Sequence, residues 1–239
     1  MCFHYSLTIE RAEIELQLGV HFEDDWHPVF HANGFSFLQM PVITQLNPGS
    51  VHLFNWGLIP HWIKTKADAD KIKTQTLNAR SETVFEKPSF RSSITNQRCL
   101  VIADGFFEWM EFQKKKYPHY IYLKNGSLFC FAGIFSSWTD KETGEHINTF
   151  SILTTKANQT MARIHNSKER MPVIIPNQFY KNWLTPNLSK EDISSFFEPY
   201  PDAALSTHTI SNLITSRTLD SNVPDIKKHF DYPELALLK

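Results

Sequence analysis

Residues 98–110, RCLVIADGFFEWM, begin the most strand-like part of the chain. Further apolar runs follow: YPHYIYL at 117–123, SLFCFAGIFSSW at 127–138, INTFSILTT at 147–155 and MPVIIP at 171–176. β-Branched and aromatic residues dominate these runs, as is typical of strands. Asn125-Gly126 lies between YPHYIYL and SLFCFAGIFSSW and predicts a tight hairpin there. The centre of the chain therefore predicts a sheet.

Shorter segments on either side predict the remaining elements. Residues 41–46 and 50–62 are short stretches punctuated by Pro and Gly, and residues 204–212 resemble a last strand. Residues 64–76 are polar and basic and predict an exposed helix or loop. Helices are predicted within residues 8–20, 78–86 (ended by Pro88), 178–184 and 190–200. Since no repeat or long linker divides the chain, we expect a single α+β domain over residues 1–239.

The balance of charge excludes attraction of nucleic acid by the chain as a whole. The 239 residues contain 24 Lys plus Arg and 25 Asp plus Glu, a net charge of -1. Any affinity for DNA must therefore come from a local basic patch.

The cysteines and the N-terminus predict the setting in which the protein works. Cys2, Cys99 and Cys130 cannot all pair and show no zinc-type spacing, so we expect reduced thiols and neither a metal nor an organic cofactor. No charged segment precedes an apolar run at the N-terminus, and no stretch approaches the ~18 apolar residues of a membrane span. We expect a cytoplasmic monomer that does not bind membranes.

Cys2 is the first candidate for covalent chemistry. Removal of Met1 would expose an α-amine and a thiol on one residue, with ordinary pKa values of ~7.7–8.0 and ~8.5. Such an aminothiol suits an aldehyde, because the amine forms an imine and the thiol then closes a five-membered thiazolidine. The alternative is that residue 2 is frayed and has no role.

Three other residues are candidates for proton transfer and positioning. Glu108 lies among aromatic residues, which would raise its pKa toward neutrality, although a solvent-facing glutamate is the alternative and Asp104 competes. His165 suits a proton shuttle, yet it is one of eleven histidines. Asn78 would orient a substrate oxygen or cap a helix.

Aromatic and basic residues that suit single-stranded DNA are interleaved near these candidates. WGLIPHWIKTK contains Trp56 and Trp62, and Arg80, Arg163 and Arg170 lie near the catalytic candidates in sequence. Base stacking on such aromatic rings contributes ~1–3 kcal/mol per base. The alternative is that the two tryptophans lie in the core and that the lysines of this segment, Lys64 and Lys66, lie on a solvated face.

Together these segments resemble the SOS response-associated peptidase (SRAP) family, whose members crosslink to abasic DNA. The resemblance covers nearly the whole chain, in the family's order. It rests on Met1-Cys2, WGLIPHW at 56–62, NARSETVFEKPSFR at 78–91, RCLVIADGFFEW at 98–109, LTTKAN at 153–158, IHNSKERMPVII at 164–175 and HTISNLITSRTLDSNVPD at 208–225. It implies a single α+β domain around a strongly bent, barrel-like mixed sheet with flanking helices.

The resemblance also implies a role for each matched residue. Cys2 would form the crosslink, and Asn78 would position its amino group and the substrate. Glu108 would transfer protons, and His165 would assist opening of the deoxyribose ring. The DNA contacts would be Arg80, Arg163 and Arg170 with at least one of Trp56 and Trp62, all flanking a cleft where the catalytic residues meet.

The implied partner is single-stranded DNA with abasic sites, met in the cytoplasm at the damaged nucleoid. The family label also implies self-removal of residues that precede Cys2, and the imine implies a lyase side reaction. A cysteine peptidase that uses Cys2 on other proteins, and a non-covalent single-strand-binding module, are the alternatives.

Two departures from the family's pattern bear on the site. Many members begin Met-Cys-Gly-Arg-Phe, whereas this chain has Phe3 and His4, so one expected phosphate contact is lost. Residues 166–169 lengthen the usual link between the histidine and Arg-Met-Pro, which would reshape one wall of the cleft.

Overall fold

The computed structural model describes residues 2–238, whose strands and helices alternate irregularly along the chain. The strands are β1 (His4–Leu7), β2 (His21–Phe22), β3 (Val29–Asn33), β4 (Gln39–Thr44), β5 (Asn47–Trp56), β6 (Asn78–Arg80), β7 (Arg98–Ala103), β8 (Gly105–Phe112), β9 (Lys115–Leu123), β10 (Phe129–Thr139), β11 (His146–Lys156), β12 (Arg170–Pro172), β13 (Ile174–Ile175) and β14 (Leu205–Thr209). The α-helices are α1 (Arg11–Leu18), α2 (Lys66–Lys73), α3 (Arg91–Asn96), α4 (Gln159–Ile164), α5 (Tyr180–Leu184) and α6 (Lys190–Ser194).

The larger sheet closes into a barrel. Its strand order is β12-β11-β10-β7-β4-β5-β2, and β5 also pairs with β11 in parallel at Asn55–Thr149 and Trp56–Phe150. This extra pairing closes a ring of β11, β10, β7, β4 and β5, which removes exposed edges from those strands. Two short strands extend this sheet: β6 pairs with β11, and β13 pairs with β10.

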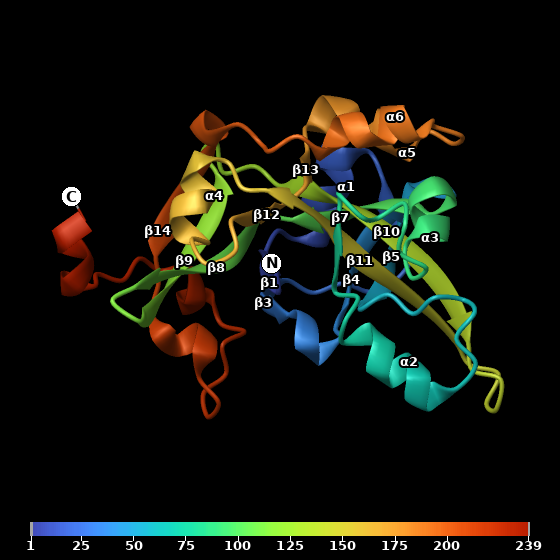
Figure 1. Cartoon of the computed structure of the whole chain (residues 1–239), viewed down its shortest axis with the longest axis horizontal. Helices are drawn as coiled ribbons and strands as arrows, with labels where there is room; N and C mark the ends of the chain where they lie inside the picture. Colours follow the sequence, from blue (N-terminus) through green and yellow to red (C-terminus); the bar gives the residue numbers. More distant parts are fainter. Residues whose placement is uncertain (1, 239) are drawn as a thin grey trace.

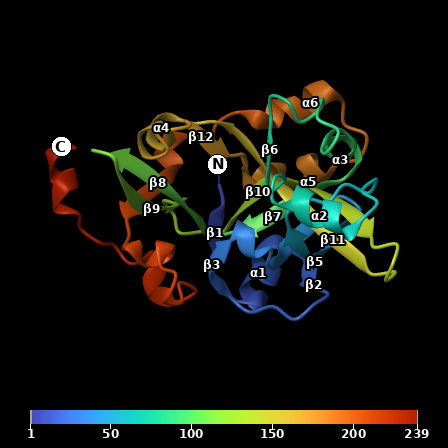
Figure 2. The same ribbon diagram turned by 60° about the horizontal axis from the view of Figure 1, so that its bottom comes forward.

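The smaller sheet grows out of the same chain segment by a sharp bend. Only Asp104 separates β7, in the barrel, from β8, in a sheet of order β14-β9-β8-β1-β3. Gly105 permits close packing at the bend, because a Cβ at this position would overlap the Tyr120 ring. Figure 1 shows this sheet on the left and the barrel on the right, and Figure 2 places β1 between them from a second direction. The strongly bent, barrel-like α+β fold is thus as predicted.

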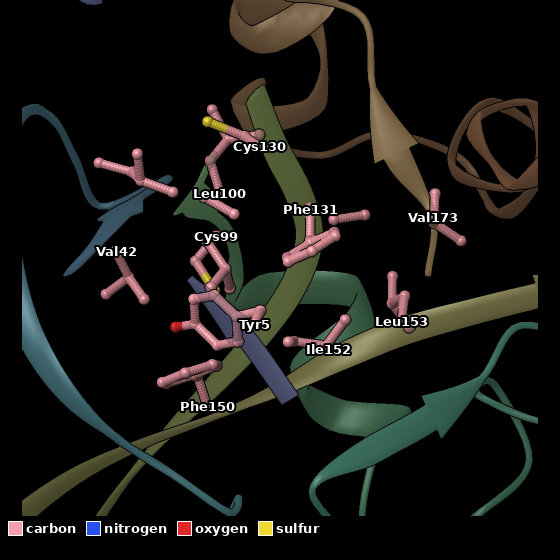
Figure 3. Close-up of a cluster of buried hydrophobic side chains, with 14 of the residues drawn as sticks. Tyr5, Val42, Cys99, Leu100, Cys130, Phe131, Phe150, Ile152, Leu153 and Val173 are labelled. Carbon is pink, nitrogen blue, oxygen red and sulfur yellow. The ribbon is translucent and has the colours of Figure 1, made fainter. Parts of the chain in front are cut away.

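Buried apolar side chains fill the space where β1 meets the barrel. Tyr5 and Leu7 are fully buried, and the Tyr5 ring makes edge contacts with Trp56 and Phe131. Figure 3 shows Tyr5 in the middle of side chains from β4, β7, β10 and β11. This contact ties the first residues of the chain to the main core.

The C-terminal segment packs on the smaller sheet. Ile226, in a 3-10 turn at Pro224–Lys227, is fully buried with Phe107 and Tyr120. Lys227 donates to the buried Asp104 carboxylate at 3.1 Å, which in turn accepts from Ser6 Oγ at 2.5 Å. The end of the chain therefore helps to hold β1 and the bend in place.

The helix predicted within residues 8–20 is present as the shorter α1, Arg11–Leu18. Two other predictions about local structure are wrong. Asn125-Gly126 makes no hairpin, because β9 pairs with β8 and β14 whereas β10 belongs to the barrel. Residues 78–86 form β6 followed by turns, since the β11 edge takes Asn78–Arg80 as a parallel strand. Within the described part of the chain, no helix has both the length and the apolar character that crossing a membrane requires.

Gly105→Ala should destabilise the fold, because the new methyl group forces the Tyr120 ring to move. Overpacking of this kind lowers the free energy of unfolding by about 1–3 kcal/mol. Urea denaturation of both proteins measures the difference. Gly49→Ala is the matched control, since a Cβ there meets no atom within 4 Å. Equal unfolding midpoints for Gly105→Ala and wild type would contradict this account of the bend.

Candidate active site

Cys2 is held in the core rather than frayed at the end of the chain. Its side chain is fully buried, and its carbonyl oxygen accepts a hydrogen bond from Asn78 Nδ2 at 2.9 Å. Burial raises the pKa of the Cys2 thiol well above its usual range, and the charge of Glu108 acts in the same direction. The sulfur is therefore a neutral thiol at physiological pH. The predicted removal of Met1 concerns a residue outside the described part of the chain.

Asn78 lies at the start of β6, which pairs with β11 at Ile152. It is buried and caps no helix, so its amide is committed to the start of the chain. Nδ2 holds Cys2, while Oδ1 has no hydrogen-bond partner among residues 2–238. A buried hydrogen-bond acceptor without a donor destabilises the fold. Asn78 Oδ1 is therefore suited to accept a hydrogen bond from a substrate that binds beside Cys2.

Glu108 lies on β8, close to Cys2, with its carboxyl group buried. Burial raises its pKa to about 7. A carboxyl group with that pKa is protonated in part of the molecules at neutral pH and can both donate and accept a proton.

His165 directly follows α4, and its Nδ1 lies 3.7 Å from Glu108 Oε1. Nδ1 also lies 3.0 Å from the carbonyl oxygen of Arg170, which can only accept, so Nδ1 carries the hydrogen and Nε2 is the basic nitrogen. Burial lowers the pKa of His165 to about 4, and the charges of Lys168 and Arg170 act in the same direction. At neutral pH the pair is thus a neutral imidazole beside a half-protonated acid.

A cleft of about 620 Å³ opens onto Glu108 and His165. Phe3, His4 and Trp109 contribute to one wall. The remaining lining side chains are mostly polar or charged: Arg80, Glu111, Lys116, Ser167, Lys168, Arg170 and Thr215. Cys2 and Asn78 are not among the described residues that line the cleft, but Cys2 directly precedes Phe3, which does, and Asn78 is hydrogen-bonded to Cys2. Of the four predicted catalytic residues, Glu108 and His165 therefore line the cleft, and Cys2 and Asn78 are buried behind it. Their catalytic roles remain predictions.

The three predicted arginines differ in what they are able to contact. Arg80 is exposed at the end of β6 and lines the cleft. Arg170 also lines it but is 5% exposed, with its guanidinium bound to both oxygens of Glu82 and to Thr154 O. Arg163 is exposed on α4 and is not among the described residues that line the cleft. Arg80 is therefore the one of the three that is placed to meet a phosphate in the cleft.

The prediction that Trp56 or Trp62 flanks the cleft is wrong. Trp56 is fully buried, donates its indole N–H to Leu77 O at 2.9 Å and stacks on Phe150, so a base cannot reach it. Trp62 is 47% exposed but lines a separate hollow beside α2. The tryptophan that lines the cleft, beside Phe3, is Trp109, whose position directly after Glu108 was the available signal.

His4 contacts Trp109 edge-on and belongs to a chain of hydrogen bonds. Its Nδ1 lies 2.8 Å from His31 Nε2, and His31 Nδ1 lies 2.7 Å from Ser221 Oγ. Burial lowers the pKa of His4 to about 3 and that of His31 to about 4. The position where the resemblance led us to expect an arginine therefore has no positive charge at neutral pH.

Comparison with known proteins agrees with the fold. Residues 1–217 match the family model described as SOS response associated peptidase (SRAP). The abasic site processing protein YoqW of Bacillus subtilis is 35% identical over 90% of this chain and 95% of its own length. The abasic site processing protein HMCES of Xenopus tropicalis is 33% identical over 66% of this chain and 49% of its own. A crystal structure from Bacteroides thetaiotaomicron is 37% identical, with a TM-score of 0.90 over 96% of this chain and all of that one.

Glu108→Gln should stabilise the protein at alkaline pH. A glutamate with the ordinary pKa of 4.5 ionises before Glu108 does in the fold, where its pKa is about 7. Between these values the unfolded state releases its proton first, so rising pH lowers the free energy of unfolding of wild type. We therefore compare the free energy of unfolding of Glu108→Gln with that of wild type at two pH values. The difference, variant minus wild type, should be roughly 2–3 kcal/mol larger at about pH 8 than near pH 4.

Chemical denaturation at both pH values measures this difference. Glu111→Gln, at an exposed position on the same strand, is the matched control and should not reproduce the gain. A Glu108→Gln difference that does not change with pH would mean that Glu108 ionises normally.

Proposed function

Because this chain belongs to the SOS response associated peptidase (SRAP) family, we propose that it processes abasic sites in single-stranded DNA by forming a covalent thiazolidine link through Cys2. The observation that carries the proposal is the burial of Cys2 beside Asn78 and Glu108, at a cleft that opens to solvent. The names of its relatives in Bacillus subtilis and Xenopus tropicalis support the choice of substrate.

The reaction begins with the closed hemiacetal form of the abasic sugar. His165 Nε2 accepts the proton of the C1′ hydroxyl as the deoxyribose ring opens and returns it to the ring oxygen O4′, which leaves an open aldehyde at C1′. The α-amine of Cys2, free once Met1 is removed, then attacks C1′ to give a carbinolamine. Glu108 donates a proton to the departing hydroxyl, so water leaves and an imine forms.

The thiol closes the ring in the second stage. Cys2 Sγ adds to C1′ of the imine, its proton passes to the nitrogen by way of Glu108, and a thiazolidine results. The raised pKa of the thiol supports this order, because a neutral thiol is a poor first nucleophile while the amine attacks. The balance is one aldehyde and one aminothiol giving one thiazolidine and one water.

The same groups support two secondary activities. An imine acidifies the neighbouring sugar proton, so strand cleavage competes until the thiol consumes the imine. The Cys2 thiol near His165 would also serve the self-removal of residues that precede Cys2.

Arg80 would bind a phosphate at the cleft, and Arg163 and Trp62 would contact only DNA that extends beyond it. In this proposal the protein is a single domain that acts as a cytoplasmic monomer at damaged DNA.

Variants at the first two positions separate the roles of the amine and the thiol. Mature protein mixed with abasic single-stranded DNA should give an adduct that survives denaturing electrophoresis. Cys2→Ser and Cys2→Ala keep the amine, so they should form only an imine that borohydride traps, with more strand cleavage than wild type. Protein that retains Met1 should form neither product, because its Cys2 nitrogen is an amide.

The outcomes distinguish the alternatives. A heat-resistant adduct from Met1-retaining protein would contradict the aminothiol mechanism. DNA binding that is fully released by denaturation, in wild type as in Cys2→Ala, would identify a non-covalent binding module. Cleavage of added peptides without any adduct would identify a peptidase.

Glu108→Gln should slow adduct formation about 10²–10⁴-fold, because a positioned acid–base group contributes this much to proton transfer. Single-turnover rates with saturating abasic DNA measure the effect. The affinity for DNA with a reduced abasic site, which lacks the aldehyde, should stay within about twofold. An unchanged rate would remove Glu108 from the mechanism.

A further inference from the structure

The loop between α4 and β12, residues 166–169, is fastened to the smaller sheet by one side chain. Asn166 Nδ2 donates to Glu111 O at 2.8 Å, and Asn166 Oδ1 accepts from Glu111 N at 3.0 Å. The amide thus pairs with the backbone of β8 as a neighbouring strand would. These are the residues that lengthen the link between His165 and Arg170, so the added length is built into the cleft.

The fastened loop brings a lysine to the cleft. Ser167 and Lys168 follow Asn166 and line the cleft, and both are exposed. The charge of Lys168 reaches His165, whose pKa it helps to lower. The loop therefore presents its cation toward the reaction site.

A second lysine lines the cleft from the adjoining hairpin. Lys116 on β9 is the cross-strand partner of Glu111, the residue to which Asn166 is bound. Lys116 and Lys168 are exposed, and neither forms an ion pair within 4.0 Å with an acidic residue in the described part of the chain. By contrast, the neighbouring Lys115 is paired with Glu234, and Arg170 with Glu82.

The balance of charge in the cleft favours an anion. Glu108 is buried and keeps its proton up to about pH 7, and Glu111 is the one other acidic residue among the described lining residues. The cationic lining residues are Arg80, Lys116 and Lys168. Arg170 is left out of this balance because Glu82 neutralises its charge. Arg80 lies on β6, which pairs with β11 of the larger sheet, whereas Lys116 comes from the β8–β9 hairpin of the smaller sheet and Lys168 from the loop at 166–169.

We propose that Lys116 and Lys168 form a phosphate subsite that binds the backbone of the DNA strand on one side of the abasic nucleotide. This inference rests on the proposed function and adds a substrate contact to it. Two lysines at a cleft also occupied by the hydroxyls of Ser167 and Thr215 suit a phosphodiester, which accepts several hydrogen bonds and carries one charge. Arg80 would bind a different phosphate, so the strand would pass across the cleft between them.

The test is the salt dependence of binding to single-stranded DNA that contains a reduced abasic site. Each phosphate contact adds about −0.7 to the slope of log affinity against log salt. Lys116→Ala and Lys168→Ala should each reduce the slope by about 0.7 and weaken binding about 5-fold at 0.1 M salt. Lys141→Ala, an exposed lysine in the turn between β10 and β11, is the matched control and should change neither.

Truncated DNA locates the contact. When the strand is shortened on the side that the subsite binds, the double variant and wild type should bind equally. An unchanged slope in the double variant would overturn the proposal, as would a defect that persists when both flanks are removed.

Asn166→Ala tests the fastening of the loop without a change of charge. It should weaken binding severalfold while the salt slope stays at the wild-type value, because both lysines remain. Wild-type affinity in this variant would overturn the positioning role of Asn166.

The adduct assay keeps this proposal separate from the proposed function. At saturating aldehydic DNA, wild type and the Lys141→Ala control should reach the same yield of adduct. If wild type forms an adduct but the lysine variants bind normally, only the subsite is wrong. If wild type forms no adduct, the proposed function itself fails.

Discussion

The interaction on which the rest of this structure depends is the insertion of β1 between β3 and β8. Backbone hydrogen bonds on both sides and the burial of Tyr5 and Leu7 hold the first residues of the chain, which elsewhere fray. Ser6 adds a hydrogen bond to Asp104 at the bend between the two sheets. The placement of β1 thereby fixes the position of Cys2, as the proposed chemistry at its nitrogen and sulfur requires.

The same burial sets the chemical state of the site. A medium of low polarity disfavours charge, so it raises the pKa of the Cys2 thiol and of Glu108 and lowers that of His165. The groups therefore rest close to neutrality, so the proton transfers that we propose among them would create little charge. This arrangement suits imine chemistry, in which one acid must both give and take a proton. The arrangement also lowers the free energy of unfolding, because the ionisable carboxyl group of Glu108 must be buried in the fold.

The cleft forms where separately built parts of the molecule meet. The barrel supplies Asn78 and Arg80 on β6, the smaller sheet supplies Glu108, and the turn after α4 supplies His165. The segment beyond residue 217, where the family match ends, adds Ser221 and Lys227, which support His31 and Asp104. The loop at 166–169 thus lines the cleft directly, whereas the segment beyond residue 217 acts on it only through the residues that hold β1 and the bend in place.

The sequence by itself determined the central strands and the residues that are candidates for the chemistry. Alternating β-branched and aromatic residues act locally, so the strands at 98–110, 127–138 and 147–155 were predictable, as was the chemical capacity of Cys2, Glu108 and His165. Only the tertiary structure decided strand partners: it separated β9 from β10 despite Asn125-Gly126, and it made 78–80 a strand against β11. It also buried Trp56, exposed Trp109 to the cleft and paired Arg170 with Glu82. Burial and pairing depend on residues that are distant in sequence, and no local pattern contains that information.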